Sequence, residues 1–107
     1  MTMPDDERNM GPQPVGPLME RWSLSNHDLV EASIEQLTHK QVQRACSGRK
    51  LTLKMMMKVA RALNIAIWNQ LKPAEKERFV EYGHKDLFSY AKDFNAEKAD
   101  PNEELFG

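Results

Sequence analysis

The sequence predicts an all-α protein, with a small core of three helices followed by a C-terminal helical hairpin. Residues that favour helix N-caps precede apolar residues at helical spacing in several places. No alternating run of β-branched or aromatic residues bounded by turn residues, the pattern typical of strands, occurs in the chain. The 107 residues suffice for one domain. We therefore expect a single helical domain without a sheet.

Both ends of the chain have the composition of disordered segments. Residues 1–17 hold four of the six prolines and little apolar material, which predicts a disordered arm. Residues 97–107 are acidic and interrupted by a proline, which predicts a disordered acidic tail. The single domain then covers residues 18–96, with its core in 26–64 and its C-terminal helices in 73–95. A domain of this size gains buried area by self-association.

Capping residues place the first two helices of the core. Either Ser25 or Asn26 is suited to cap a helix that begins at about residue 27. Thr38 is suited to cap a second helix over residues 39–47, which we expect Gly48 to end in the left-handed conformation. These assignments predict a helix break between residues 32 and 38.

The third helix follows a short connection. Thr52 precedes a stretch with apolar residues at helical spacing, which predicts a helix over residues 53–63 with Asn64 at its end. Residues 65–71 then form a short helix of their own or a connection.

The C-terminal hairpin is expected to consist of two further helices. Pro73 suits the first turn of a helix over residues 73–82, and Gly83 follows that helix. Apolar residues at helical spacing predict the second helix over residues 85–94. We expect the hairpin to pack on the core through Phe79, Leu87 and Phe88, and we also expect the aromatic side chains of Trp22 and Trp68 inside the protein.

Charge is distributed unevenly along a chain that is almost neutral overall. The chain has fifteen Lys and Arg residues and sixteen Asp and Glu residues, but residues 36–74 contain no carboxylate. Eight bases lie in that run: Lys40, Arg44, Arg49, Lys50, Lys54, Lys58, Arg61 and Lys72. A basic region between acidic ends produces a directional field that attracts polyanions, most often nucleic acid.

The helix predicted after Thr38 has the residue types that read duplex DNA. Helical spacing turns Val42 and Ala45 inward and leaves polar side chains outside. Gln and Arg form bidentate contacts with base edges in the major groove, whereas Lys and helix N-termini contact phosphates. The predicted DNA-binding residues are therefore Thr38, His39, Lys40, Gln41, Gln43, Arg44, Arg49, Lys50 and Lys54.

Residues 37–64 resemble the helix-turn-helix of lambda-repressor-like and lac-repressor-like DNA-binding domains. The features in common are Leu37-Thr38, Val42, Arg44, Gly48, Arg49-Lys50 and the final ValAlaArgAlaLeuAsn. The resemblance covers about a quarter of the chain. It implies a helix-turn-helix core and a small transcriptional regulator that reads the major groove with the helix that begins near Thr38.

Two other arrangements of this region remain open at the sequence level. The turn of the family normally contains a Gly, which residues 33–36 lack, and Ser33 with Gln36 has the spacing of a capping box. One continuous helix from Ile34 to Ser47 would then replace the turn. In the other arrangement residues 53–63 form the reading helix and expose Lys54, Lys58 and Arg61.

Catalysis, metal binding and membrane insertion are not expected. The three histidines lack the spacing of a zinc helix, and the chain has one cysteine and no Gly-rich phosphate loop. We therefore predict no enzyme, no cofactor and no metal site. The acidic, polar start is unlike a signal peptide, and no apolar run is long enough for a membrane span. We expect a cytoplasmic protein that does not interact with membranes.

Partners follow from the basic region. Double-stranded DNA is the expected partner, and the C-terminal helices are a candidate homodimer contact. The main alternative function is a helical protein-interaction module whose basic face docks an acidic partner. RNA binding is less favoured, because it would place stacking aromatic side chains beside the basic residues.

Overall fold

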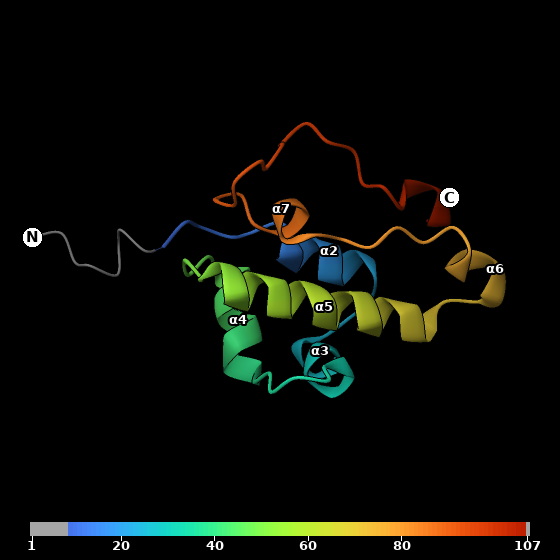
Figure 1. Ribbon diagram of the computed structural model, residues 1–107, viewed down its shortest axis with the longest axis horizontal. Coiled ribbons are helices and arrows are strands. Elements are labelled where there is room, and N and C mark those ends of the chain that lie inside the picture. Colours follow the sequence, from blue (N-terminus) through green and yellow to red (C-terminus); the bar gives the residue numbers. More distant parts are fainter. Residues whose placement is uncertain (1–8, 107) are drawn as a thin grey trace, which may run out of the picture.

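The computed structural model of the protein describes residues 9–106 (Figure 1). Within these residues there are six α-helices, one 3-10 helix and no strand, which confirms the all-α fold. The helices are α2 (Val15–Arg21), α3 (Asn26–Ala32), α4 (His39–Ser47), α5 (Leu53–Gln70), α6 (Pro73–Lys76), α7 (His84–Leu87) and the 3-10 helix η1 (Glu103–Leu105).

The eighteen-residue helix α5 is the centre of the protein and runs along much of its length (Figure 1). It packs against α3, α4 and α7, while α2 packs against α4. The core side of α5 buries Met56, Val59, Ala60, Ala62, Leu63, Asn64, Ala66 and Ile67. Burial on this scale is the main favourable term that holds the short surrounding helices in place.

The predicted caps of the three core helices are present. Ser25 forms a reciprocal capping box at the start of α3, and Thr38 forms one at the start of α4. The Thr52 side chain accepts a hydrogen bond from the first turn of α5. Gly48 ends α4 with φ of 104°, the left-handed conformation that favours glycine.

The break between α3 and α4 is where the caps predicted it. The hydroxyl of Ser33 bonds the backbone of Glu35, so it stabilises a turn and does not cap a helix with Gln36. A continuous helix from Ile34 to Ser47 is therefore excluded. The segment between the two helices spans residues 33–38 and contains no glycine.

Helix α5 is longer than predicted. It does not stop at Asn64 but continues to Gln70, so residues 65–71 do not form a separate helix. Asn64 is buried, and its side chain accepts from the backbone N–H of Tyr82 and donates to the carbonyl of the same residue. Because its amide bonds another segment, it does not compete with the backbone of its own helix.

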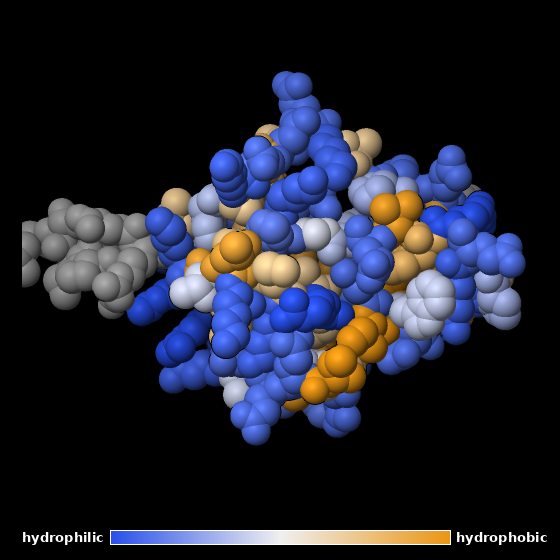
Figure 2. Space-filling view, in the orientation of Figure 1, coloured by the Kyte–Doolittle hydropathy of each residue, from blue (hydrophilic) through white to orange (hydrophobic). Residues whose placement is uncertain are grey.

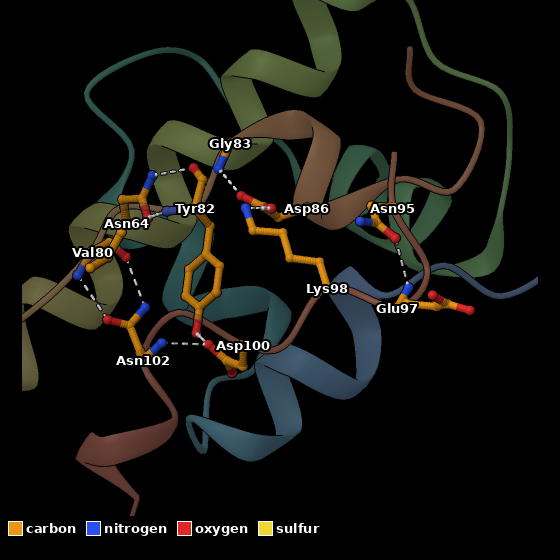
Figure 3. Close-up of polar contacts among 10 residues, drawn as sticks. All are labelled: Asn64, Val80, Tyr82, Gly83, Asp86, Asn95, Glu97, Lys98, Asp100 and Asn102. Carbon is orange, nitrogen blue, oxygen red and sulfur yellow. Dashed lines mark hydrogen bonds and ion pairs between the residues drawn. The ribbon is translucent and has the colours of Figure 1, made fainter. Parts of the chain in front are cut away.

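The predicted C-terminal helical hairpin is wrong. Helices α6 and α7 have four residues each, and residues 79–83 between them have an irregular, non-helical backbone. Two asparagine side chains each pair with both backbone groups of one residue in this segment: Asn64 with Tyr82 and Asn102 with Val80 (Figure 3). These contacts satisfy the backbone groups that a helix would otherwise have paired internally.

The two predicted disordered ends also differ from the structure within residues 9–106; residues 1–8 and 107 lie outside the described part. Val15 is fully buried, and the buried side chain of Gln13 accepts hydrogen bonds from Ser89. In the C-terminal segment Asn102 is buried, and Asp100 accepts a hydrogen bond of 2.6 Å from the Tyr82 hydroxyl. Specific side-chain hydrogen bonds attach both segments despite their polar composition.

Aromatic side chains from the C-terminal part of the chain pack around Trp22 at the end of α2. Trp22 is buried, and its ring contacts Phe79 and Phe106 edge to face. Phe88 is fully buried, as expected. Trp68 was predicted to lie inside the protein, and this is wrong. It lies on the surface of α5, where 44% of it is exposed.

Candidate nucleic-acid interface

Helix α4 has one buried and one exposed face. Val42 and Ala45 have no exposed surface, and the thiol of Cys46 lies 3.7 Å from the sulfur of Met19. Partial burial raises the pKa of the Cys46 thiol. The exposed face carries His39, Lys40, Gln43, Arg44 and Ser47. The helical spacing therefore predicted the orientation of α4 correctly.

Contacts within the protein occupy three of the predicted site residues at the start of α4. The Thr38 hydroxyl accepts from the Gln41 backbone, and the Gln41 side chain accepts from the Thr38 backbone. A ring nitrogen of His39 lies 3.2 Å from one of His27, whose other nitrogen lies 3.3 Å from a carboxylate oxygen of Glu31. These side chains fix the first turn of the helix, and Lys40, Gln43 and Arg44 project beyond it.

The turn after α4 is attached to the rest of the protein on two sides. On one side the Met10 N–H donates to the Gly48 carbonyl at 2.7 Å, and a side chain at position 48 would overlap the Gly11 backbone. On the other side the Tyr90 hydroxyl accepts from the Leu51 N–H at 2.9 Å. The turn that carries Arg49 and Lys50 is thus held in one conformation.

The basic residues of α5 are not equivalent to those of α4. Lys54 is exposed in the first turn of α5. Arg61 donates two hydrogen bonds, of 2.7 and 2.8 Å, to Glu35. These bonds, with the charges of Arg61, Lys58 and Lys54, lower the pKa of the Glu35 carboxyl. Glu35 therefore occupies one edge of the Arg61 guanidinium, whereas no described residue forms such a pair with Lys54.

Two lysines that the sequence analysis missed lie beside the turn. A surface hollow of about 570 Å³ is lined by Lys50 and also by Lys85 and Lys92, together with His84 and the carboxylate of Asp93. No signal in the carboxylate-free run could have identified them, because they come from the C-terminal part of the chain. Figure 2 shows hydrophilic side chains over the end of the molecule where Figure 1 places α4.

The described residues form neither a metal site nor a membrane-spanning helix. Between residues 9 and 106, no group of three or more His, Cys, Asp or Glu side chains is arranged to hold a metal ion. Over the same range, every helix is too short or too polar to cross a bilayer.

Comparison with known proteins gives no further assignment. No family model matches the chain, and it has no match among curated proteins or among solved structures.

Proposed function

We propose that this protein binds double-stranded DNA and reads the major groove with helix α4. The observation that carries the proposal is the exposed face of α4, which lies beside an anchored basic turn at one end of the molecule. An α-helix fits the major groove, and contacts from a fixed turn to phosphates set the orientation of such a helix.

The exposed residues have separate roles in this proposal. Arg44 and Gln43 lie on the outer face of α4 and have the donor and acceptor geometry for base edges. Arg49, Lys50 and Lys54 follow the helix and contact phosphates. The N-terminus of α4 is oriented toward the phosphates of the DNA. The contact of His39 with His27 and the Thr38–Gln41 pair keep it in this orientation.

The first test is the salt dependence of binding to a random-sequence duplex. If about five of the eight bases contact phosphates, the slope of log affinity against log salt is roughly −4 to −5. The Lys50→Ala variant should weaken binding to all sequences alike and reduce the slope by about one. Lys72→Ala is the matched control, because Lys72 belongs to the same basic run but precedes α6 at the opposite end of the molecule (Figure 1).

The second test is sequence preference. Selection from a random duplex pool provides a preferred site, on which Arg44→Ala should cost about 1–3 kcal/mol of binding free energy and relax discrimination. The Lys58→Ala variant should leave the preference unchanged.

The outcomes discriminate among the alternatives. A flat salt dependence would contradict DNA binding and favour a protein partner. If Lys58→Ala lost the sequence preference while Arg44→Ala kept it, α5 would be the reading helix. Equal, small effects of Arg44, Lys50 and Lys58 would indicate a diffuse basic surface without a reading helix.

A further inference from the structure

A group of apolar side chains, two of them exposed, lines a groove outside α4. The groove has a volume of about 590 Å³ and lies between α5, the α3–α4 connection and the segment before α7. Its walls include Ile34, Ile65, Trp68 and Phe79, with Arg61 and Glu81 beside them. Figure 2 shows hydrophobic side chains gathered over α5 and this connection on the face toward the viewer.

Two of these side chains are more exposed than apolar residues of a small domain usually are. Ile34 is 86% exposed, and Trp68 is 44% exposed. The backbone around Ile34 is held by the Ser33 turn and by the Glu35–Arg61 pair, so this exposure belongs to an ordered segment. A contiguous apolar surface with charged residues at its edge marks an interaction site.

We propose that a second copy of this chain occupies the groove and forms a two-fold symmetric dimer. In a two-fold contact the same surface meets itself, so each residue pair occurs twice. The groove carries Arg61 and Glu81 beside its apolar walls. Arg61 pairs with Glu35 of its own chain through Nε and Nη2, and Nη1 takes no part in that pair. In the dimer Nη1 of Arg61 in each copy faces Glu81 of the other, while Ile34 and Trp68 are buried between the copies.

The position of the groove is compatible with the proposed reading helix. The hydrophobic side chains over α5 and the α3–α4 connection face the viewer in Figure 2, and Figure 1 places α4 toward one end, so a partner in the groove leaves α4 accessible. A two-fold axis parallel to α5 places both α4 helices at the same end of the dimer. Helix-turn-helix dimers read half-sites about 34 Å apart in the same way. This functional reason depends on the proposed DNA binding, whereas the dimer itself does not.

The dimer contact differs from the one suggested by the sequence. The C-terminal helices were the expected contact, but they have only four residues each, and Leu87 on α7 is fully buried in the core. The groove uses α5 and the α3–α4 connection, with the segment before α7 at its edge.

Sedimentation equilibrium of the full chain without DNA tests the dimer. Apparent mass should rise from 12.3 kDa toward twice that value with increasing concentration. The Ile34→Glu variant should weaken association about tenfold or more, because it places a charge at the centre of the contact. Leu53→Glu is the matched control: Leu53 is also an exposed aliphatic residue, at 54%, but lies outside the groove. A mass of one chain at all concentrations, or equal effects of the two variants, would overturn the proposal.

A second variant and a fluorescence readout separate loss of contact from loss of folding. Glu81→Lys should also weaken association, with an unchanged circular dichroism spectrum. Trp68 emission should shift to shorter wavelength as the dimer forms, and this shift should be absent in Ile34→Glu. A dimer without DNA affinity would leave this inference in place and remove the proposed function. DNA binding by a chain that stays monomeric would overturn this inference and leave the proposed function in place.

Discussion

The two parts of the molecule pair their backbone groups in different ways. In residues 15–70 the N–H and C=O groups bond mainly within helices, and capping side chains complete the helix ends. In residues 77–106, here called the strap, side chains distant in sequence do much of this work. Asn64 and Asn102 each bond both backbone groups of one strap residue (Figure 3). Gln13 accepts a hydrogen bond from the backbone of another, Ser89.

This difference has an energetic consequence. A helix contains many similar hydrogen bonds, so the loss of one cap changes the free energy of unfolding modestly. The strap depends on a few side chains, and removal of one leaves buried backbone groups without a partner. Single substitutions at strap contacts should therefore destabilise the protein more than substitutions at helix caps.

The largest effect is expected at Gly48. This helix end, like the strap, contacts a segment that is distant in sequence, the backbone of Met10 and Gly11. The Gly48→Ala variant combines an unfavourable positive φ with overlap between the new methyl group and the Gly11 backbone. We expect a loss of about 3 kcal/mol or more in the free energy of unfolding. Urea denaturation measures this loss, and Gly83→Ala, with φ of −97° and only ordinary van der Waals contacts for the new methyl group, is the control. Equal stability of both variants would contradict the close approach of the N-terminal segment.

The next largest effect is expected for Asn64→Ala. It leaves the N–H and the C=O of Tyr82 unpaired in the interior, which should cost about 2–3 kcal/mol. Asn69→Ala, at an exposed position of the same helix, should change stability by less than about 0.5 kcal/mol. Similar melting temperatures for the two variants would show that the strap does not depend on this side chain.

A smaller effect is expected at the cap of α4. The Thr38→Ala variant removes one side of the capping box and should cost about 1 kcal/mol. Thermal unfolding followed by circular dichroism measures it. A loss as large as that of Asn64→Ala would contradict the contrast between the two parts.

The last prediction concerns a loss of stability that is absent at neutral pH and appears at alkaline pH. Burial, together with its hydrogen bond to Asp100, raises the pKa of Tyr82, and burial also raises the pKa of Tyr90. The folded state therefore keeps protons that the unfolded chain releases near pH 10, so stability should fall as pH rises above about 10. Absorbance at ~295 nm should show tyrosinate appearing together with unfolding. Tyr82→Phe should reduce this pH dependence, and ionisation of both tyrosines in the folded chain would contradict it.

The helical part could be predicted from the sequence because its signals are local. The caps at Ser25, Thr38 and Thr52 act within three residues of themselves, and Gly48 terminates its own helix. The exposed face of α4 followed from helical spacing alone. These features need no knowledge of distant residues.

The strap could not be predicted because its partners are remote. Asn64 and Tyr82 are 18 residues apart, and Asn102 and Val80 are 22 apart, without a periodic pattern to connect them. The sequence pattern therefore predicted a helix end at Asn64, and the apolar residues of the strap predicted a helical hairpin. The same reason hid Lys85 and Lys92 from the predicted interface, since only the folded chain brings them beside Lys50.

Asn64 and Asn102 make the strap sensitive to the exchange of a single side-chain atom. Conversion of asparagine to aspartate keeps the shape of the side chain but exchanges its donor for a second acceptor. The new oxygen would face the carbonyl of Tyr82 or of Val80, which the amide nitrogen now binds. A change of a single atom would thus turn an attachment into a repulsion, so the Asn64→Asp and Asn102→Asp variants should loosen the strap.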